Sequence, residues 1–155
     1  MLDRVRSGQS HEYRRYLQFG QGLKLDAQPD RLELVRKGKP VADVFSETTA
    51  PAQQRRYAKG DERDPMAGLI FPDFRDVDQR WTAWFDTRGD DVDHAFTISL
   101  KAGEHAFHAA LGSSLDTNPV RVDVDRGGKP RFSLFVTRDG GKLAVKQVDA
   151  HGKSG

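Results

Sequence analysis

The chain has 155 residues, no cysteine and a net charge of +2, from 25 Lys and Arg against 23 Asp and Glu. This length fits a single domain, residues 1–155, with a real hydrophobic core, and the lack of cysteine excludes disulfides, thiolate metal sites and a cysteine nucleophile. With 36% hydrophobic residues and 15 glycines, the composition is typical of a soluble, turn-rich protein rather than a disordered one.

No apolar run approaches the roughly 20 residues that cross a bilayer, and the first residues have no apolar block of the signal-peptide kind. We therefore expect no membrane span. The sequence does not determine the compartment, because a cysteine-free protein suits any redox environment. A bacterial envelope or secreted location is our working guess.

The charge is unevenly distributed. Residues 1–63 carry 13 Lys and Arg against 9 Asp and Glu, residues 64–93 carry 3 against 8, and residues 94–155 carry 9 against 6. The chain thus has an acidic centre between basic flanks. An ordinary mixed surface explains this pattern, and so does an acidic patch that attracts a basic partner or a cation.

At the N-terminus, we expect residues 1–10 to be frayed and residues 11–19 to form a short helix. Tyr13, Tyr16 and Leu17 fall at helical spacing, and Ser10 is available as an N-cap. Arginines beside tyrosines also suit a nucleic-acid partner, since arginines bind phosphates and tyrosines stack on bases. With no basic stripe elsewhere, we do not expect a nucleic-acid partner.

From Leu23 the hydrophobic period changes to two, which predicts strands at 23–25 and 32–34 and a hairpin turn at 36–39. Residues 46–66 are nearly all polar and predict one long loop. Residues 68–74 predict a short strand whose apolar side chains plug an edge of the core.

The centre of the sequence holds both tryptophans. Trp81 to Phe85 predicts a strand with a large aromatic on each face, and Phe96 to Leu100 predicts the strand that returns beside it. The Asp-rich segment 86–93 would then be the tip of this hairpin. Residues 101–112 fit either a strand or a helix, and Gly103 favours the strand.

The C-terminal third has the clearest pattern. Valines alternate with charges from Val120 to Val124, a Gly-Gly turn follows, Phe132 to Val136 runs back, and Asp139-Gly140 turns the chain again. This predicts a three-stranded meander, with residues 150–155 frayed. The whole pattern indicates a mainly β protein, an antiparallel β-sandwich or barrel-like sheet of about 8–9 strands with a short N-terminal helix.

The acidic segment is the first candidate site. Its carboxylates suit a hard cation such as Ca²⁺, although the order of a calcium-binding loop is missing and an arginine lies among them. Aspartates that satisfy turn backbone are the alternative. The residues we assign to binding are Asp86, Arg88, Asp90, Asp91, Asp93 and Trp84.

The histidines are weaker candidates. His94, His105 and His108 offer imidazoles for Zn²⁺, but on a strand His105 and His108 point to opposite faces. We therefore expect no metal and no cofactor, with Ca²⁺ or Zn²⁺ as the exceptions to test. No nucleophile elbow or phosphate-binding glycine loop occurs, and no spacing among the many carboxylates marks a general acid and base, so no sequence motif supports an enzyme.

The resulting hypothesis is a non-catalytic binding module for a protein partner, of the inhibitor or immunity type or an accessory domain of a surface or secretion assembly. The acidic segment and the polar stretch 46–66 would form its contact surface. One alternative is a carbohydrate or small-ligand domain that stacks its ligand on an exposed tryptophan. A second alternative is a metal-dependent enzyme that uses the histidines.

Overall fold

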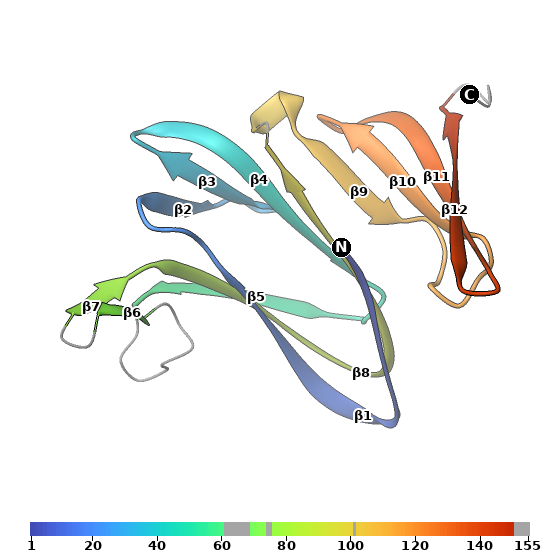
Figure 1. The fold of residues 1–155 in the computed structure, drawn as a ribbon, viewed down its shortest axis with the longest axis horizontal. Coiled ribbons are helices and arrows are strands. Elements are labelled where there is room, and N and C mark those ends of the chain that lie inside the picture. Colours follow the sequence, from blue (N-terminus) through green and yellow to red (C-terminus); the bar gives the residue numbers. More distant parts are fainter. Residues whose placement is uncertain (61–68, 74–75, 101, 151–155) are drawn as a thin grey trace.

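The computed structural model describes residues 1–60, 69–73, 76–100 and 102–150, and these form a mainly β protein with two antiparallel sheets that pack together (Figure 1). The first sheet has the order β1-β8-β4-β3-β2, with β5 also paired to β8, and the second has the order β12-β11-β10-β9. The strands are β1 Leu2–Gln18, β2 Leu23–Ala27, β3 Leu32–Arg36, β4 Lys39–Thr48, β5 Gln53–Lys59, β6 Leu69–Asp73, β7 Asp76–Gln79, β8 Trp81–Ser99, β9 Phe107–Leu111, β10 Val120–Arg126, β11 Lys129–Asp139 and β12 Lys142–Asp149.

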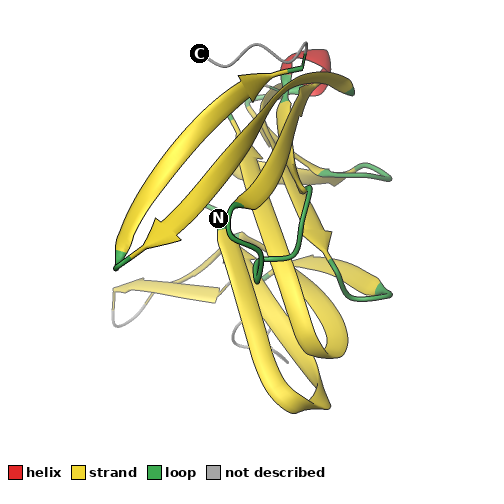
Figure 2. Cartoon of the chain, turned by 90° about the vertical axis from the view of Figure 1, so that its right-hand side faces the viewer, coloured by secondary structure: helices red, strands yellow, loops and turns green. Residues whose placement is uncertain are grey.

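The mainly β, sandwich-like fold expected from the sequence is therefore confirmed. A 3-10 turn, η1 at Gly103–His105, is the only helical element in the described residues, as seen in Figure 2. None of the described elements is a helix long and apolar enough to cross a membrane. Strands β6 and β7 form a separate two-stranded pair.

Strand β8 organises the first sheet. One edge of β8 pairs with β1 from Ala95 down to Thr82, while the other edge pairs with β5 over its first half and with β4 over its second half. The β1–β8 ribbon bends in its middle, where residues 7–10 of β1 bulge opposite Asp90. This bend brings the two halves of the ribbon around a common interior (Figure 1).

The predicted hairpin at 86–93 is wrong. The chain does not reverse there, and residues 81–99 form one continuous strand. The backbone of the Asp-rich segment is paired with β1, from Asp86 opposite Arg14 to Asp93 opposite Arg4. Because Gly89 is not in the left-handed region that a tight hairpin turn uses, the segment stays extended.

The N-terminal helix and the frayed end are also wrong, since both segments belong to β1. The amino group of Met1 donates to the Phe96 carbonyl at 2.7 Å, so the chain is paired from its first residue. The helical spacing at 11–19 is overridden because pairing with β8 satisfies the backbone along the whole segment and buries alternate side chains.

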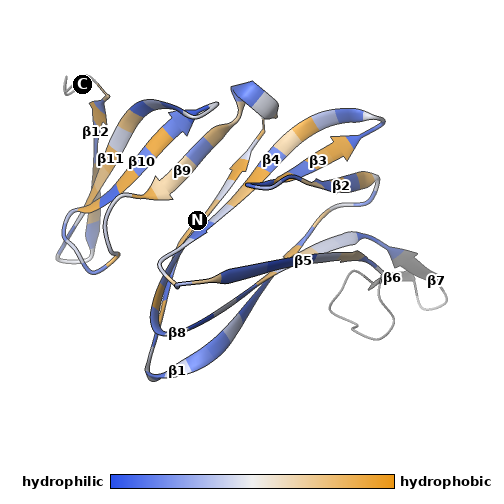
Figure 3. Cartoon of the chain, turned by 180° about the vertical axis from the view of Figure 1, so that it is seen from behind, coloured by the Kyte–Doolittle hydropathy of each residue, from blue (hydrophilic) through white to orange (hydrophobic). Residues whose placement is uncertain are grey.

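The long loop at 46–66 is wrong in its described part. Strand β4 continues to Thr48, and β5 occupies Gln53–Lys59, while residues 61–66 lie outside the described residues. Strand β5 is almost wholly hydrophilic (Figure 3), so it carries none of the apolar alternation from which strands are predicted. Its backbone is nevertheless satisfied by β8.

The other strand predictions are confirmed. Strands β2, β3 and β4 form the expected hairpins, and β10, β11 and β12 form the predicted meander. The strand favoured for residues 101–112 is confirmed only for β9 at 107–111, since residues 103–105 form η1. Residues 69–73 are a strand as expected. Whether its side chains plug the core lies outside the described residues.

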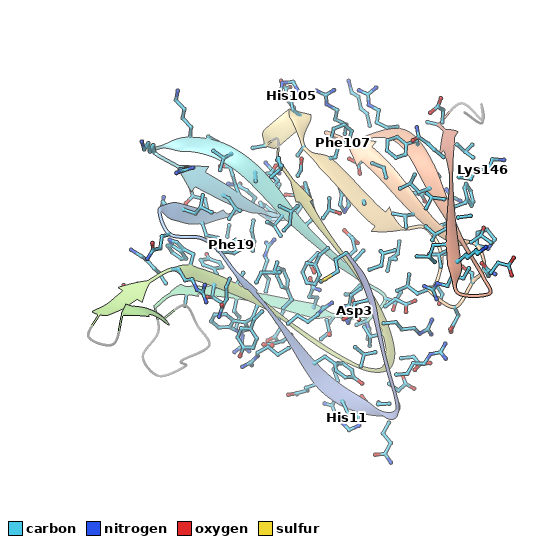
Figure 4. All side chains as sticks on the ribbon, viewed as in Figure 1. Asp3, His11, Phe19, His105, Phe107 and Lys146 are labelled. Carbon is cyan, nitrogen blue, oxygen red and sulfur yellow. The ribbon has the colours of Figure 1, made fainter. Side chains whose placement is uncertain are left out.

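Two hydrophobic clusters hold the sheets. The larger one lies inside the curled first sheet and includes Phe19, Leu32, Phe85 and Phe96, and the smaller one lies on the second sheet around Val120 and Val122. Figure 4 labels Phe19 within the first sheet, and His105 and Phe107 where η1 leads into β9. Burial of these apolar side chains is the main stabilising term of both sheets.

The two sheets meet where β9 lies against β8. Thr97 of β8 exchanges two hydrogen bonds with Ala109 of β9, and its Oγ1 lies 3.2 Å from the Ala109 nitrogen and 3.3 Å from the Ala109 oxygen. The Phe107 amide donates to Ser99 Oγ at 3.0 Å. Polar contacts therefore fix how the second sheet sits on the first.

Candidate functional site

The outward face of strands β1, β8 and β5 gathers charged and aromatic side chains. The register places Asp86 between Arg14 and Gln54, and Trp84 between Tyr16 and Arg56. Directly opposed residues of an antiparallel sheet share one face, so these side chains form cross-strand rows. We call this the β1–β8–β5 face, and its members are Glu12, Arg14, Tyr16, Gln54, Arg56, Trp84, Asp86 and Arg88.

An ion-paired carboxylate lies at the centre of this face. Arg14 donates to both oxygens of Asp86, with Nε 2.6 Å from Oδ1 and Nη2 3.2 Å from Oδ2. Arg56 approaches from β5, with its Nε 3.7 Å from Oδ2. The hydrogen bonds to Asp86 raise the pKa of Arg14 above its usual value. The carboxylate thus orients two arginines that remain about half exposed, at 43% and 54%.

Aromatic rings lie beside this ion pair. The rings of Tyr16 and Trp84 are both half-buried, with centroids 6.2 Å apart and planes at 37°. A depression of about 510 Å³ runs over the face, and side chains from all three strands line it. Tyr16 belongs to the lining, whereas Trp84 supports Tyr16 from the neighbouring strand. Arg88 is exposed and makes no ion pair within the described part of the chain.

The remaining predicted acidic residues lie around the bend of the ribbon. Asp90 and Asp91 are exposed, and the Asp91 amide donates to Asp90 Oδ1 at 2.9 Å. Asp93 is buried, at 3% exposed, and accepts hydrogen bonds from Ser114 Oγ at 3.0 Å and from the Leu115 amide at 2.8 Å. Asp93 therefore has a structural role, because it anchors the loop before β10.

Arginines of β1 neutralise this acidic cluster. Arg4 lies 3.7 Å from Asp91 and 3.4 Å from Asp93, and it also pairs with Asp116. Arg6 pairs with Asp116 as well. The acidic centre and the basic N-terminal flank of the sequence thus meet within the molecule, which leaves little of the acidic patch free for a basic partner.

The three histidines do not converge. His94 is fully buried inside the first sheet, His105 is exposed in η1, and His108 lies on β9 between the sheets. Among the residues that the structure describes, no three His, Asp or Glu side chains are arranged to hold a metal. The Asp-rich segment forms no such cluster either, because its members pair with different arginines.

His108 joins the two sheets. Its Nε2 lies 3.0 Å from Glu47 of β4, its Nδ1 lies 3.1 Å from Asp125 of β10, and its ring packs on Phe45 with centroids 4.7 Å apart. His108, Phe45 and Asp125 border a cleft of about 330 Å³ between the sheets. Contacts with two carboxylates and one aromatic ring thus tie His108 to both sheets.

Sequence reasoning missed the contributions of β1 and β5 to the site. The sequence pattern assigns Arg14 and Tyr16 to a helix, and Gln54 and Arg56 to a loop. The available signal is weak: Tyr13, Leu17 and Phe19 fit a period of two as well as a helix, but Arg15 interrupts this apolar alternation. For β5 the sequence holds no such signal.

Comparison with known proteins adds no relative, since no family model, no curated protein and no solved structure matches the chain. The function has to be argued from the geometry of the chain itself.

Proposed function

We propose that this protein is a non-catalytic binding module that recognises a partner protein through the β1–β8–β5 face. The observation that carries the proposal is the row Tyr16, Trp84 and Arg56, with Arg14 and Asp86 in the next row. Tyr, Trp and Arg are the residues that most often supply the binding energy of protein interfaces. Here they share one rigid sheet surface.

The face is ordered without a partner. Its side chains project from paired strands, and Asp86 holds Arg14 in a two-pronged contact, so little side-chain freedom is lost on binding. The depression of about 510 Å³ supplies a recess for an anchoring side chain of the partner.

The charge of the face favours an acidic partner. It carries Arg14, Arg56 and Arg88 against Glu12 and Asp86. Asp86 is already paired with two of the arginines, whereas Arg88 is exposed and open to a carboxylate of the partner. The proposal thus keeps Trp84, Asp86 and Arg88 from the sequence-based assignment and reverses the expected charge of the partner.

The carbohydrate alternative has less support on this face. A sugar ring needs a flat aromatic surface beside polar groups. Tyr16 lines the depression, but Trp84, the next residue of the row, is half-buried and does not line it. Glycan binding is therefore kept as an outcome of the test.

The test compares two charge-reversal variants as baits in affinity capture from the source cells. We expect wild type to retain a stoichiometric partner, and Arg56→Glu/Arg88→Glu to bind it at least tenfold more weakly in a subsequent titration. The matched control is Arg36→Glu/Arg138→Glu, which makes the same charge change at exposed positions away from the face.

Equal affinity of the partner for the face variant and the control would overturn the proposal. If the bait retains no protein and an oligosaccharide quenches its tryptophan fluorescence, the ligand of this face is a glycan and not a protein.

A further inference from the structure

The inner face of the bent β1–β8 ribbon carries a second group of polar side chains. Tyr13 lies opposite Thr87, and Arg15 lies opposite Phe85, so these four residues share a face. Phe85 contacts Phe96 edge to face, with ring centroids 5.1 Å apart. The second arm of β8, which is the part after the bend, therefore faces the same interior.

The second arm brings His94 and Phe96 to this interior. They are two residues apart on one strand and therefore point the same way. The guanidinium carbon of Arg15 lies 4.9 Å from the centre of the Phe96 ring. We call Tyr13, Arg15, Thr87 and His94 the inner donor cluster.

All four side chains are buried at their polar ends and lack partners. The three guanidinium nitrogens of Arg15, the hydroxyls of Tyr13 and Thr87, and both ring nitrogens of His94 are inaccessible and accept or donate no hydrogen bond to any described residue. The His94 side chain is fully buried. A buried polar group without a partner is costly, and a buried charge without a counter-ion costs more.

The groups share one chemical property, because each of them can donate a hydrogen bond. A guanidinium offers five N–H donors and no acceptor, the two hydroxyls offer one each, and a neutral imidazole offers one. Such a set complements a ligand that is rich in acceptors and negatively charged.

We infer that the inner donor cluster is a binding site for a small oxyanion, a carboxylate or a phosphate, with Arg15 as its counter-charge and with Tyr13, Thr87 and His94 as hydrogen-bond donors.

The protonation states agree with this role. Burial lowers the pKa of Arg15 to about 10, so the guanidinium remains charged at neutral pH. Burial and the charge of Arg15 lower the pKa of His94 to about 4, so the imidazole is neutral and one ring nitrogen carries a proton to donate.

The depression on the β1–β8–β5 face borders the cluster beside the bend. Tyr13 and Thr87 also line the depression on the β1–β8–β5 face, so that depression reaches the ribbon at the two cluster residues nearest the bend. The site is distinct from the proposed partner face, because Arg15 and His94 take no part in that face.

Asp3 is the competing counter-ion. It lies opposite His94 in the register, and its charge acts on Arg15, but it is exposed and forms no ion pair with Arg15 in the described structure. Figure 4 shows Asp3 on the N-terminal arm of β1. If Asp3 supplied the counter-charge in solution, an added anion would have no effect on the wild-type protein.

The experiment measures thermal unfolding at constant ionic strength, with chloride replaced by sodium acetate in one arm and by sodium phosphate in the other. For the wild type we expect a saturable rise in Tm of several degrees as the concentration passes Kd. The arm with the lower midpoint concentration identifies whether the site prefers a carboxylate or a phosphate.

Two variants at the cluster and one control accompany the wild type. Arg15→Met should abolish the saturable rise while folding at least as stably in chloride, because a buried unpaired charge is replaced by an apolar side chain of similar length. Tyr13→Phe should raise the midpoint concentration about fivefold to tenfold through the loss of one donor. Arg36→Met, at an exposed position, should respond like the wild type.

A rise that is equal in wild type and Arg15→Met would reflect general salt effects and would overturn the inference. If the Tm of the wild type rises in neither arm, the inference is also overturned. A saturable rise in the Tm of Asp3→Ala under the same conditions would then identify Asp3 as the counter-ion of Arg15.

Discussion

Arg4 shows how single residues connect parts of this molecule that are far apart in the sequence. From β1 it reaches Asp91 and Asp93 on β8 and Asp116 in the loop before β10. Asp93 in turn fixes that loop by accepting the Leu115 amide. A salt bridge on an exposed surface contributes little, but here Asp93 is buried, so loss of Arg4 would leave the charge of Asp93 without a counter-ion.

His94 predicts how stability depends on pH. Its folded-state pKa of about 4 lies below the ordinary value of 6.5, so between these values the unfolded chain binds the proton more readily. Stability from this residue is therefore present above pH 6.5 and is lost as the pH falls toward 4. Between pH 7 and pH 5 we expect a loss of about 2 kcal/mol.

Urea denaturation of wild type and His94→Gln at both pH values checks this expectation. The variant lacks the titrating group, so it should lose about 2 kcal/mol less than the wild type over the same interval. An equal loss of stability in both proteins would show that folding does not lower the pKa of His94.

At the level of elements, the turn between β10 and β11 is built against η1. The Gly127 amide donates to the Ala106 carbonyl at 3.1 Å. A Cβ at Gly127 would lie 2.5 Å from the Glu104 carbonyl oxygen, whereas a Cβ at Gly128 would meet nothing within 4 Å. Both glycines have positive φ, at 58° and 75°. Substitutions at these two glycines therefore separate the steric cost of close packing from the cost of the backbone conformation.

We predict that Gly127→Ala destabilises the protein by about 1–3 kcal/mol more than Gly128→Ala. Both substitutions carry the similar cost of a left-handed alanine, but only the first forces the Glu104 backbone to move. Chemical denaturation of the two variants measures the difference directly. Equal free energies of unfolding would mean that the close contact between the turn and η1 does not limit the residue at position 127.

On the scale of the whole molecule, the two sheets are joined by a small set of polar contacts. Thr97 and Ser99 of β8 bond to β9, and His108 bridges Glu47 and Asp125. These contacts define how the meander is placed on the sheet that carries the β1–β8–β5 face. The meander itself is held by the smaller hydrophobic cluster.

Thr97→Val should destabilise the docked arrangement by about 1–2 kcal/mol, because it removes both hydrogen bonds to Ala109 and leaves that amide unpaired. Thr137→Val makes the same change on an exposed position of β11 and should alter stability by less than about 0.5 kcal/mol. Urea denaturation followed by tryptophan fluorescence gives both values, and a neutral Thr97→Val would show that the sheets do not depend on this contact.

The sequence by itself determined the β class, the hairpins of β2 to β4 and the meander of β10 to β12, because there the apolar alternation and the turn residues lie close together along the chain. It also singled out Trp84, Asp86 and Arg88.

Only the tertiary structure decided that residues 81–99 form one bent strand and that β1 and β5 flank it. Those pairings join positions about 20 to 90 residues apart, and their strands are polar on one or both faces, so no local pattern reveals them. The same long-range pairing placed basic residues of β1 on the acidic centre, gathered the β1–β8–β5 face, and enclosed Arg15 with His94.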